Sequence, residues 1–374
     1  MGIRELSLDQ TLVLRLLRAA YCAEGELCAF EALPEGLDWQ KVYEAAVQHG
    51  VPAVALDGLQ RLMAAHPEWA WELDWPEWEE VKYEWFGQIF LAEEQYRKYQ
   101  RAIGSLAAFY QQHGIPMMVL KGYSCSLGYP VPEHRPCGDI DIWLFGRYKE
   151  ADALLAKEKG VKIDTTHHHH TVFTWNGQMV ENHYDLINVH DRKSSRALER
   201  IFKERAQDSS VQVVVSGAQI VVLAPTFHAL FLIRHAAAHF SAVEIQLRHL
   251  LDWGFWVKAH AGEIDWQWLS EKADRFGFLP FMSLVDAICV EDLGFERWLF
   301  PTLPVDPALK QRVLAEILQP EFSEPQPRGF VRRVLFKYRR WHVGIWKHRL
   351  CYRETAWSSF WSSAWAHLLK PGSI

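Results

Sequence analysis

The sequence GDIDIWLF, at residues 138–145, places two acidic side chains in a short run that is otherwise apolar. A β-strand turns successive side chains to opposite faces, so Asp139 and Asp141 share one face and the intervening isoleucines take the other. Two carboxylates held this close repel each other and raise each other's pKa unless a cation lies between them. The pattern predicts a strand with one core face and one cation-binding face. A solvated strand edge is the alternative.

The segments around this strand predict a small mixed sheet. Before it, IPMMVLKG at 115–122 has the apolar character of a buried strand that ends in a glycine turn. After it, RYKEADALLAKEKG at 147–160 predicts a helix that ends at its glycine. The pair Asn176-Gly177 between two alternating runs is the strongest local signal of a hairpin. This order predicts an α+β fold, with helices packed on one side of the sheet.

Helical patterns flank the predicted sheet. Residues 1–112 carry amphipathic spacing without a chemical motif, and they are expected to form an N-terminal helical region. The α/β core is expected at 113–223 and a C-terminal helical region at 224–374. Within the last region, PRGFVRRVLFKYRRWHVGIWKHRLCYR at 327–353 is basic and aromatic and contains no acidic residue. This tail could dock on the protein itself, on RNA or on an anionic membrane surface.

The composition is that of a globular protein. The chain has 374 residues, of which 49% are hydrophobic and 23% charged, and its net charge of −6 gives no general attraction to nucleic acid or membranes. No run approaches the length of a membrane span, and the N-terminus reads as an amphipathic helix rather than a signal peptide. The six cysteines are scattered without CxxC spacing. Reduced thiols and a cytoplasmic location are therefore expected.

Four motifs follow one another in a fixed order: LKGYSCSLGYP…RPCGDIDIWLF, VENHYDL, LAPTFHALFLIRHAAAHF and LRHLLDW. Together they resemble a family of uncharacterised bacterial nucleotidyltransferases, NTP_transf_5, within the superfamily of DNA polymerase β. The resemblance covers about residues 39–275. It implies an enzyme that transfers a nucleoside monophosphate from an NTP to a hydroxyl group, releases pyrophosphate, and uses Mg²⁺ or Mn²⁺.

Three carboxylates are the expected metal ligands and catalytic residues. Nucleotidyl transfer relies on positioning and on neutralisation of developing charge by metal ions, and Asp139 and Asp141 could hold two ions about 3.5–4 Å apart. Superfamily members usually place a third carboxylate on a neighbouring strand. Alternation along QMVENHYDL puts Glu181 and Asp185 on one face, so both qualify. The Glu-x-His pattern of the resembling family favours Glu181, which would bind metal and align the attacking hydroxyl. Asp185 remains the alternative.

The turn at Lys121 and Gly122 lies where the superfamily uses a Gly-Ser element to approach the triphosphate. Glycine lets the backbone come close, and the following helix start offers free N–H groups. Ser124 adds a hydroxyl donor, although Tyr123 interrupts the usual Gly-Ser pair. Gly122 is therefore the main expected nucleotide-binding residue, with Ser124 and Lys121 as its partners.

Two further side chains each have two interpretations. Arg135, just before the acidic strand, would either contact a phosphate or form an ion pair with Glu133. His183, on the same strand face as the third carboxylate, would either orient the hydroxyl and contact phosphate or serve as a hydrogen-bonded structural histidine.

Histidines form two more groups. The run His167–His170 is typical of adventitious metal binding rather than catalysis, and alternation aims His168 and His170 one way. On the helix after Pro225, the pattern HAAAH puts His235 and His239 one turn apart, a spacing that can bind zinc. Together with Arg248 and Asp252 they match the family signature, so they are expected to form the helical wall of the cleft.

The acceptor is open: it could be a small molecule, a sugar, a protein side chain or an RNA end, because a fold does not determine it. Two other functions remain as alternatives. One is a non-catalytic protein that uses the same fold to bind a nucleotide or a partner. The other is a zinc hydrolase centred on His235 and His239.

Overall fold

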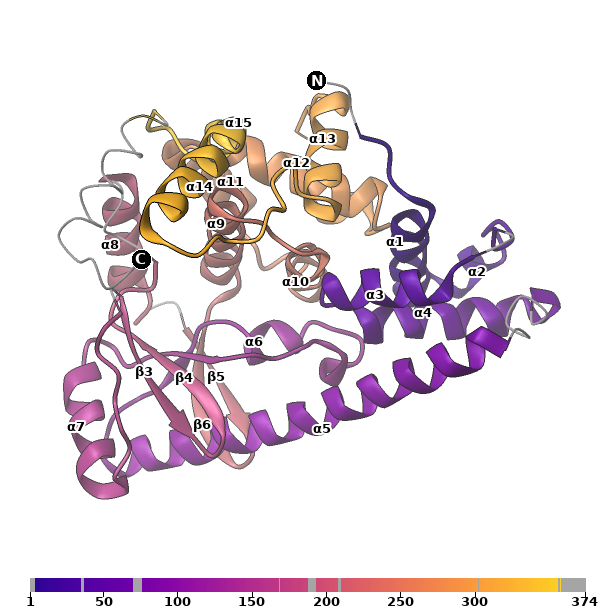
Figure 1. Cartoon of the computed structure of the whole chain (residues 1–374). Helices are drawn as coiled ribbons and strands as arrows, with labels where there is room; N and C mark the ends of the chain where they lie inside the picture. The colour runs from indigo at the N-terminus through magenta and orange to yellow at the C-terminus, as the bar shows by residue number, and fades with distance from the viewer. Residues whose placement is uncertain are drawn as a thin grey trace.

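The computed structural model describes residues 4–34, 37–69, 76–167, 169–187, 193–207, 210–301, 303–355 and 357. The prediction for His168 and that for the end of the tail, 358–374, lie outside these residues. The predicted α+β class is confirmed: a mixed sheet lies among helices that come from both ends of the chain (Figure 1). The division into three regions stays a prediction.

The chain begins with a layer of helices: α1 (Leu8–Tyr21), α2 (Glu24–Leu27), α3 (Trp39–Gln48), α4 (Pro52–Ala65) and α5 (Pro76–Gln112). Ser7 starts α1 with a capping box, because its hydroxyl accepts from the backbone of Gln10 while the Gln10 side chain accepts from the backbone of Ser7. Helices α1 and α4 cross closely at Gly58, where an added Cβ would lie 1.8 Å from the carbonyl oxygen of Leu16. The absence of a side chain at Gly58 therefore allows α1 and α4 to approach this closely.

The described strands form one six-stranded sheet in the order β3-β4-β2-β1-β6-β5. They are β1 (Met118–Val119), β2 (Ile140–Trp143), β3 (His170–Trp175), β4 (Gln178–His183), β5 (Ser210–Val215) and β6 (Ala218–Leu223). Strand β2 is parallel to β4 and β1 is parallel to β6, whereas the other neighbours are antiparallel. The predicted hairpin is confirmed, since β3 and β4 join at Asn176-Gly177.

The two faces of the sheet have different surroundings. On one face, Ile140 and Ile142 are fully buried against the second half of α5 and against α7 (Tyr148–Lys159). On the other face, Trp143 belongs to the apolar cluster that includes the C-terminal helices. Alternation along β2 therefore works as the sequence predicts: the isoleucines pack under the sheet, and Asp141 faces the space between the sheet and those helices.

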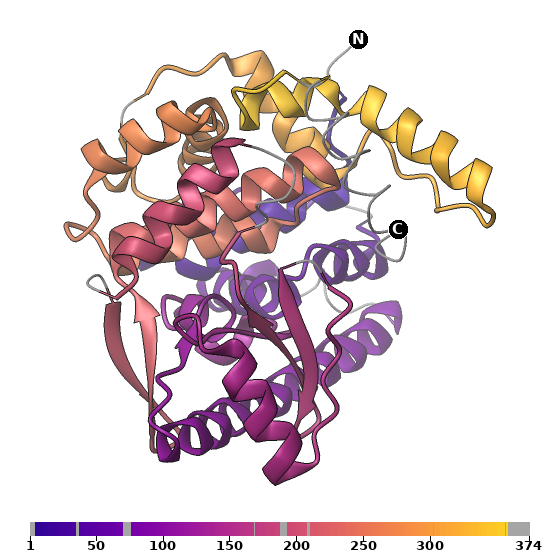
Figure 2. The ribbon, with the colours of Figure 1, turned by 90° about the vertical axis from the view of Figure 1, so that its left-hand side faces the viewer.

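Short helices and the C-terminal helical region complete the fold. The connection from β1 to the acidic strand β2 contains α6 (Tyr123–Ser126) and the 3₁₀ helix η2 (Pro132–His134). The later helices are α8 (Lys193–Arg205), α9 (Pro225–Ala242), α10 (Leu247–Ala259), α11 (Trp266–Phe276), α12 (Leu279–Glu291), η3 (Arg297–Leu299), α13 (Pro307–Leu318), α14 (Phe330–Val343) and α15 (Ile345–Cys351). Helix α14 extends outward from the body, seen in yellow in Figure 2.

The basic tail is helical over its described part and docks partly on the protein. In α15, the buried Lys347 Nζ lies 2.8 Å from Glu316 of α13, and Cys351 is fully buried. In α14, by contrast, Val334, Leu335 and Tyr338 are exposed. Among the residues that the structure describes, no helix combines the length and apolar character that a membrane crossing requires.

Candidate functional site

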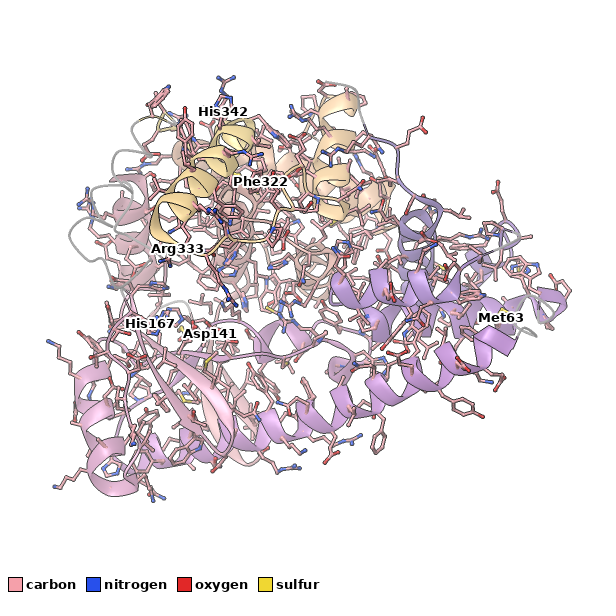
Figure 3. The ribbon with its side chains drawn as sticks, in the orientation of Figure 1. Met63, Asp141, His167, Phe322, Arg333 and His342 are labelled. Carbon is pink, nitrogen blue, oxygen red and sulfur yellow. The ribbon has the colours of Figure 1, made fainter. Side chains whose placement is uncertain are left out.

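Strands β2 and β4 bring two of the predicted carboxylates together. Their parallel register sets Asp141 directly beside Glu181, and both side chains leave the same face of the sheet. The side chain of Asp141 is 3% exposed and that of Glu181 is 19% exposed, so the pair is shielded from water but still accessible. Figure 3 shows Asp141 between the sheet and the C-terminal helices.

His183 joins the two carboxylates from the end of β4. Its Nε2 atom lies 3.0 Å from Asp141 Oδ1 and 3.3 Å from Glu181 Oε2. Burial lowers the pKa of His183, but the hydrogen bonds to Asp141 and Glu181 outweigh it and raise the pKa to about 9. Donor atoms of Asp141, Glu181 and His183 all lie within 4.8 Å of one another, which is a spacing that can hold a metal ion.

Lys121 is the second cation at the carboxylates. Its Nζ lies 3.1 Å from Asp141 Oδ1, and its side chain is 27% exposed. Burial raises the pKa of Asp141, but Lys121 and then His183 overcome this effect and hold the pKa well below its ordinary value. Asp141 is therefore ionised at neutral pH, as a metal ligand must be.

Asp139 lies one residue before β2 and is half-buried. Burial raises its pKa, and the charges of Asp141 and Glu181 raise it further. Its donor atoms are not part of the group formed by Asp141, Glu181 and His183. The carboxylates of Asp141 and Glu181 repel that of Asp139, and a divalent cation bound among them would relieve this repulsion.

The glycine turn is built against Tyr99 of α5. Gly122 has φ +67° and ψ −100°, and an added Cβ would lie 2.3 Å from the Tyr99 hydroxyl, which donates to the backbone carbonyl of Asp139. Two residues after Gly122, Ser124 is fully buried, and its Oγ has no hydrogen-bond partner among the described residues. An unpaired buried hydroxyl beside the acidic strand fits a ligand that accepts a hydrogen bond, such as a phosphate.

Arg135 and Asp252 occupy different positions from those predicted. The Arg135 guanidinium donates to both Asp252 oxygens, from Nε at 2.7 Å and from a terminal nitrogen at 2.8 Å, and Tyr129 donates to the same carboxylate. Both partners are buried. The predicted pairing of Arg135 with Glu133 is therefore wrong, because Asp252 takes its place. A phosphate contact finds no support either, since this guanidinium is already bound.

Asp185 is the second carboxylate that the structure keeps apart from the cluster. Strand β4 ends at His183, and Asp185 lies two residues further on, where the chain leaves the sheet. The carboxylate of Asp185 forms an ion pair with Lys203 of α8. Its backbone carbonyl contacts His183 Nδ1 at 3.3 Å. Of the two candidates for the third carboxylate, Glu181 is the one that lies beside Asp141.

The residues predicted for the helical wall lie on α9 and α10. His235 and His239 lie with ring centroids 4.4 Å apart, and burial lowers the pKa of His235, an effect that the nearby charge of Lys121 increases. Arg248 is half-buried, and its Nε has no hydrogen-bond partner in the described chain. Two groups of three metal-ligating side chains occur in the described residues, and neither contains His235 or His239. The zinc alternative thus finds no support in the structure.

Three residues of this region were not among those predicted to bind the nucleotide or the catalytic metal, or to line the helical wall. Tyr99 packs against the glycine turn at Gly122 and donates to the backbone carbonyl of Asp139, which lies 40 residues further along the chain. His249 of α10 lies within 6.4 Å of the His235 ring and extends the helical wall. His170 approaches Glu181, with Nε2 3.7 Å from Oε1. Only His170 could have been found, because the hairpin signal at Asn176-Gly177 fixes the pairing of β3 with β4.

Comparison with known proteins agrees with this geometry. A family model described as uncharacterised nucleotidyltransferase, NTP_transf_5, matches residues 35–294, which is more than half of the chain. The chain therefore belongs to this nucleotidyltransferase family. Comparisons with curated proteins and with solved structures gave no match.

Proposed function

We propose that the protein is a Mg²⁺- or Mn²⁺-dependent nucleotidyltransferase that moves a nucleoside monophosphate from an NTP to a hydroxyl acceptor and releases pyrophosphate. The observation that carries this proposal is the register of β2 and β4, which sets Asp141 beside Glu181 with their donor atoms at metal-binding distance. Family membership independently supports nucleotidyl transfer.

In this proposal, Asp139, Asp141 and Glu181 are the metal ligands. Carboxylate oxygens are the donors that Mg²⁺ and Mn²⁺ prefer, so the residues present fit these ions. Held by these three carboxylates, such ions would supply positive charge against the negative charge that develops on the transferred phosphoryl group. Glu181 also aligns the attacking hydroxyl or accepts its proton. The Nε2 atom of His183 holds the carboxylates of Asp141 and Glu181 in place.

The phosphates of the NTP are proposed to lie at the glycine turn. Gly122 allows close backbone approach, the unpaired Oγ of Ser124 supplies a hydrogen bond, and Lys121 supplies positive charge. Arg135 is left out of this phosphate site because Asp252 binds its guanidinium. His235, His239 and Arg248 line the opposite helical wall, where the half-buried cation of Arg248 suits an anionic substrate.

The acceptor class stays open between a small molecule, a sugar, a protein side chain and an RNA end. A cytoplasmic location, where NTPs are abundant, is part of the proposal. The surviving alternative is a non-catalytic protein that binds a nucleotide or a partner with the same fold. The unpaired hydroxyl of Ser124 fits nucleotide binding in either case, so turnover has to be measured.

The test is pyrophosphate release from each of the four NTPs, with cell extract as the source of acceptor. We expect pyrophosphate release with at least one NTP, and we expect this release to require Mg²⁺ or Mn²⁺. The rate of release should fall by roughly 10²-fold or more in Asp141→Asn. Asp274→Asn is the matched control, because this exposed carboxylate forms an ion pair with the exposed Arg353. Release that is unchanged in Asp141→Asn would contradict the proposal. Nucleotide binding without turnover, indifferent to metal by calorimetry, would favour the non-catalytic alternative.

A further inference from the structure

A second group of potential metal ligands lies at the start of β3. His170 is paired in register with His183 across the antiparallel β3–β4 ladder, so the two rings leave the same face of the sheet. His169 precedes them, and donor atoms of His169, His170 and His183 all lie within 4.8 Å of one another. Their ring centroids are 4.4 Å (His169 to His170), 5.1 Å (His170 to His183) and 5.5 Å (His169 to His183) apart.

The backbone holds these histidines in place. The carbonyl of His169 accepts hydrogen bonds from the backbone N–H groups of Tyr184 and Asp185, at 3.0 and 3.3 Å. These bonds tie the residue before β3 to the segment that follows β4, so the backbone of His169 is held against the sheet that carries His170 and His183. Sites on regular elements hold ligand geometry more accurately than sites on loops.

His170 shows that this cluster is chemically incomplete. Its side chain is 8% exposed, and its Nδ1 is buried without a hydrogen-bond partner in the described chain. A buried polar nitrogen is costly to leave unpaired, and a metal ion is a partner that neutral imidazole accepts readily. The donor chemistry also differs from that of the neighbouring carboxylates, because three imidazoles favour zinc-like ions over Mg²⁺.

We propose that His169, His170 and His183 form a second metal site that binds one transition-metal ion of the zinc type. The site lies beside the carboxylate cluster and shares His183 with it, because the Nε2 atom of His183 contacts Asp141 and Glu181. An ion in the histidine site therefore lies next to the proposed catalytic centre without using its carboxylates. The inference rests on the histidine geometry and does not require that the protein transfers nucleotides.

The test uses the full-length protein after removal of any affinity tag. Co²⁺ serves as a spectroscopic probe, since its visible absorption reports nitrogen ligands in a four-coordinate site, and Zn²⁺ binding is measured by calorimetry. We expect one ion per chain, with Zn²⁺ displacing Co²⁺. His170→Ala should weaken Zn²⁺ binding by roughly tenfold or more and abolish the Co²⁺ spectrum.

Three control variants define which residues hold the ion. His167→Ala removes an exposed histidine that stacks on His170 but lies outside the group, so binding should stay within about threefold of wild type. His235→Ala and Asp141→Asn should also retain the ion. Loss of Zn²⁺ in His235→Ala would place the ion on the α9 histidines, and loss in Asp141→Asn would place it on the carboxylates. Either result would overturn the inference.

A structural failure of the variant is tested separately. Zn²⁺ should raise the Tm of the wild-type protein and leave that of His170→Ala unchanged, while both proteins show the same circular dichroism without metal. His169→Gln provides a second variant and should show the same weakened binding. Zn²⁺ binding to His170→Ala with wild-type affinity would refute the site, whatever the NTP assay shows. Conversely, absence of pyrophosphate release would leave this metal site unaffected.

Discussion

Arg135 binds both carboxylate oxygens of Asp252, across 117 residues of sequence and inside the protein. Removal of one partner would leave the other charged and unpaired, so Arg135→Met and Asp252→Leu should each lower the free energy of unfolding by about 3–5 kcal/mol. The double variant should lose much less than the sum of the two. Urea unfolding measures all three changes.

The control for this pair is an exposed ion pair on the surface. Arg339 and Glu324 are 63% and 49% exposed, so Arg339→Met should cost less than about 1 kcal/mol. Equal losses for Arg339→Met and Arg135→Met would show that burial does not determine the strength of the Arg135–Asp252 pair.

Gly122 is constrained both by its backbone and by Tyr99. Alanine at this position meets a positive φ and the Tyr99 hydroxyl, so Gly122→Ala should destabilise the protein by more than Gly146→Ala, where φ is +86° but space is open. The φ strain alone is expected to cost about 1–3 kcal/mol. Adding Tyr99→Phe to Gly122→Ala should recover part of the difference. If chemical unfolding gives equal losses for the two alanine variants, the contact with Tyr99 is not limiting.

Two helical glycines should respond to alanine with opposite signs. Gly58→Ala would push its Cβ into the Leu16 carbonyl at the crossing of α1 and α4, and should cost about 1–3 kcal/mol. Gly87 is exposed on α5 with nothing within 4 Å of an added Cβ, so Gly87→Ala should add about 0.5–1 kcal/mol. Thermal and urea unfolding compare the two. A stabilising Gly58→Ala would mean that the two helices lie further apart.

Asp286 makes stability depend on pH. It lines a cavity of about 350 Å³, burial raises its pKa to about 8 from an ordinary value of 3.8, and the Trp253 indole N–H donates to its Oδ1. Between these values the folded state keeps a proton that the unfolded state has lost. The free energy of unfolding should therefore fall as pH rises from about 4 to about 8.

Asp286→Asn keeps an oxygen acceptor for Trp253 and removes the titration. The variant should lose less stability than wild type between pH 5 and 8, as measured by urea unfolding at several pH values. Asp274→Asn, at an exposed carboxylate, should keep the wild-type slope. Parallel slopes for wild type and Asp286→Asn would refute the raised pKa.

Local patterns predicted the elements that carry the chemistry. The period-two alternation of residues 138–145 placed Ile140 and Ile142 in the core and Asp141 on the opposite face. Along β4 the same periodicity put Glu181, His183 and Asp185 on one face, and only the Glu-x-His pattern of the resembling family favoured Glu181. The hairpin before β4 followed from its turn residues. The strand faces and the hairpin turn depend on residues that are close together in the chain, so one sequence is enough to predict them.

The incorrect predictions depend on contacts that are distant in sequence. Glu133 lies two residues from Arg135 and looked like its partner, but the fold brings Asp252 of α10 there instead. Alternation predicted that Asp185 shares the face of Glu181. The strand ends at His183, however, and the side chain of Asp185 pairs with Lys203 instead. Alternation predicts direction only while a strand continues, and ion pairing is decided by tertiary packing.

Helix α5 joins two parts of the protein that the sequence divides at residue 112. Its first half, with Trp78 and Trp85, packs in the apolar cluster of the N-terminal helices, and its second half, with Tyr99 and Tyr110, packs under the sheet. A truncated chain that starts at 113 would keep every acidic ligand and yet expose the isoleucine side of β2 to water. Any shortened version of this protein would therefore have to retain α5. On heating, the sheet and α5 should unfold in a single transition.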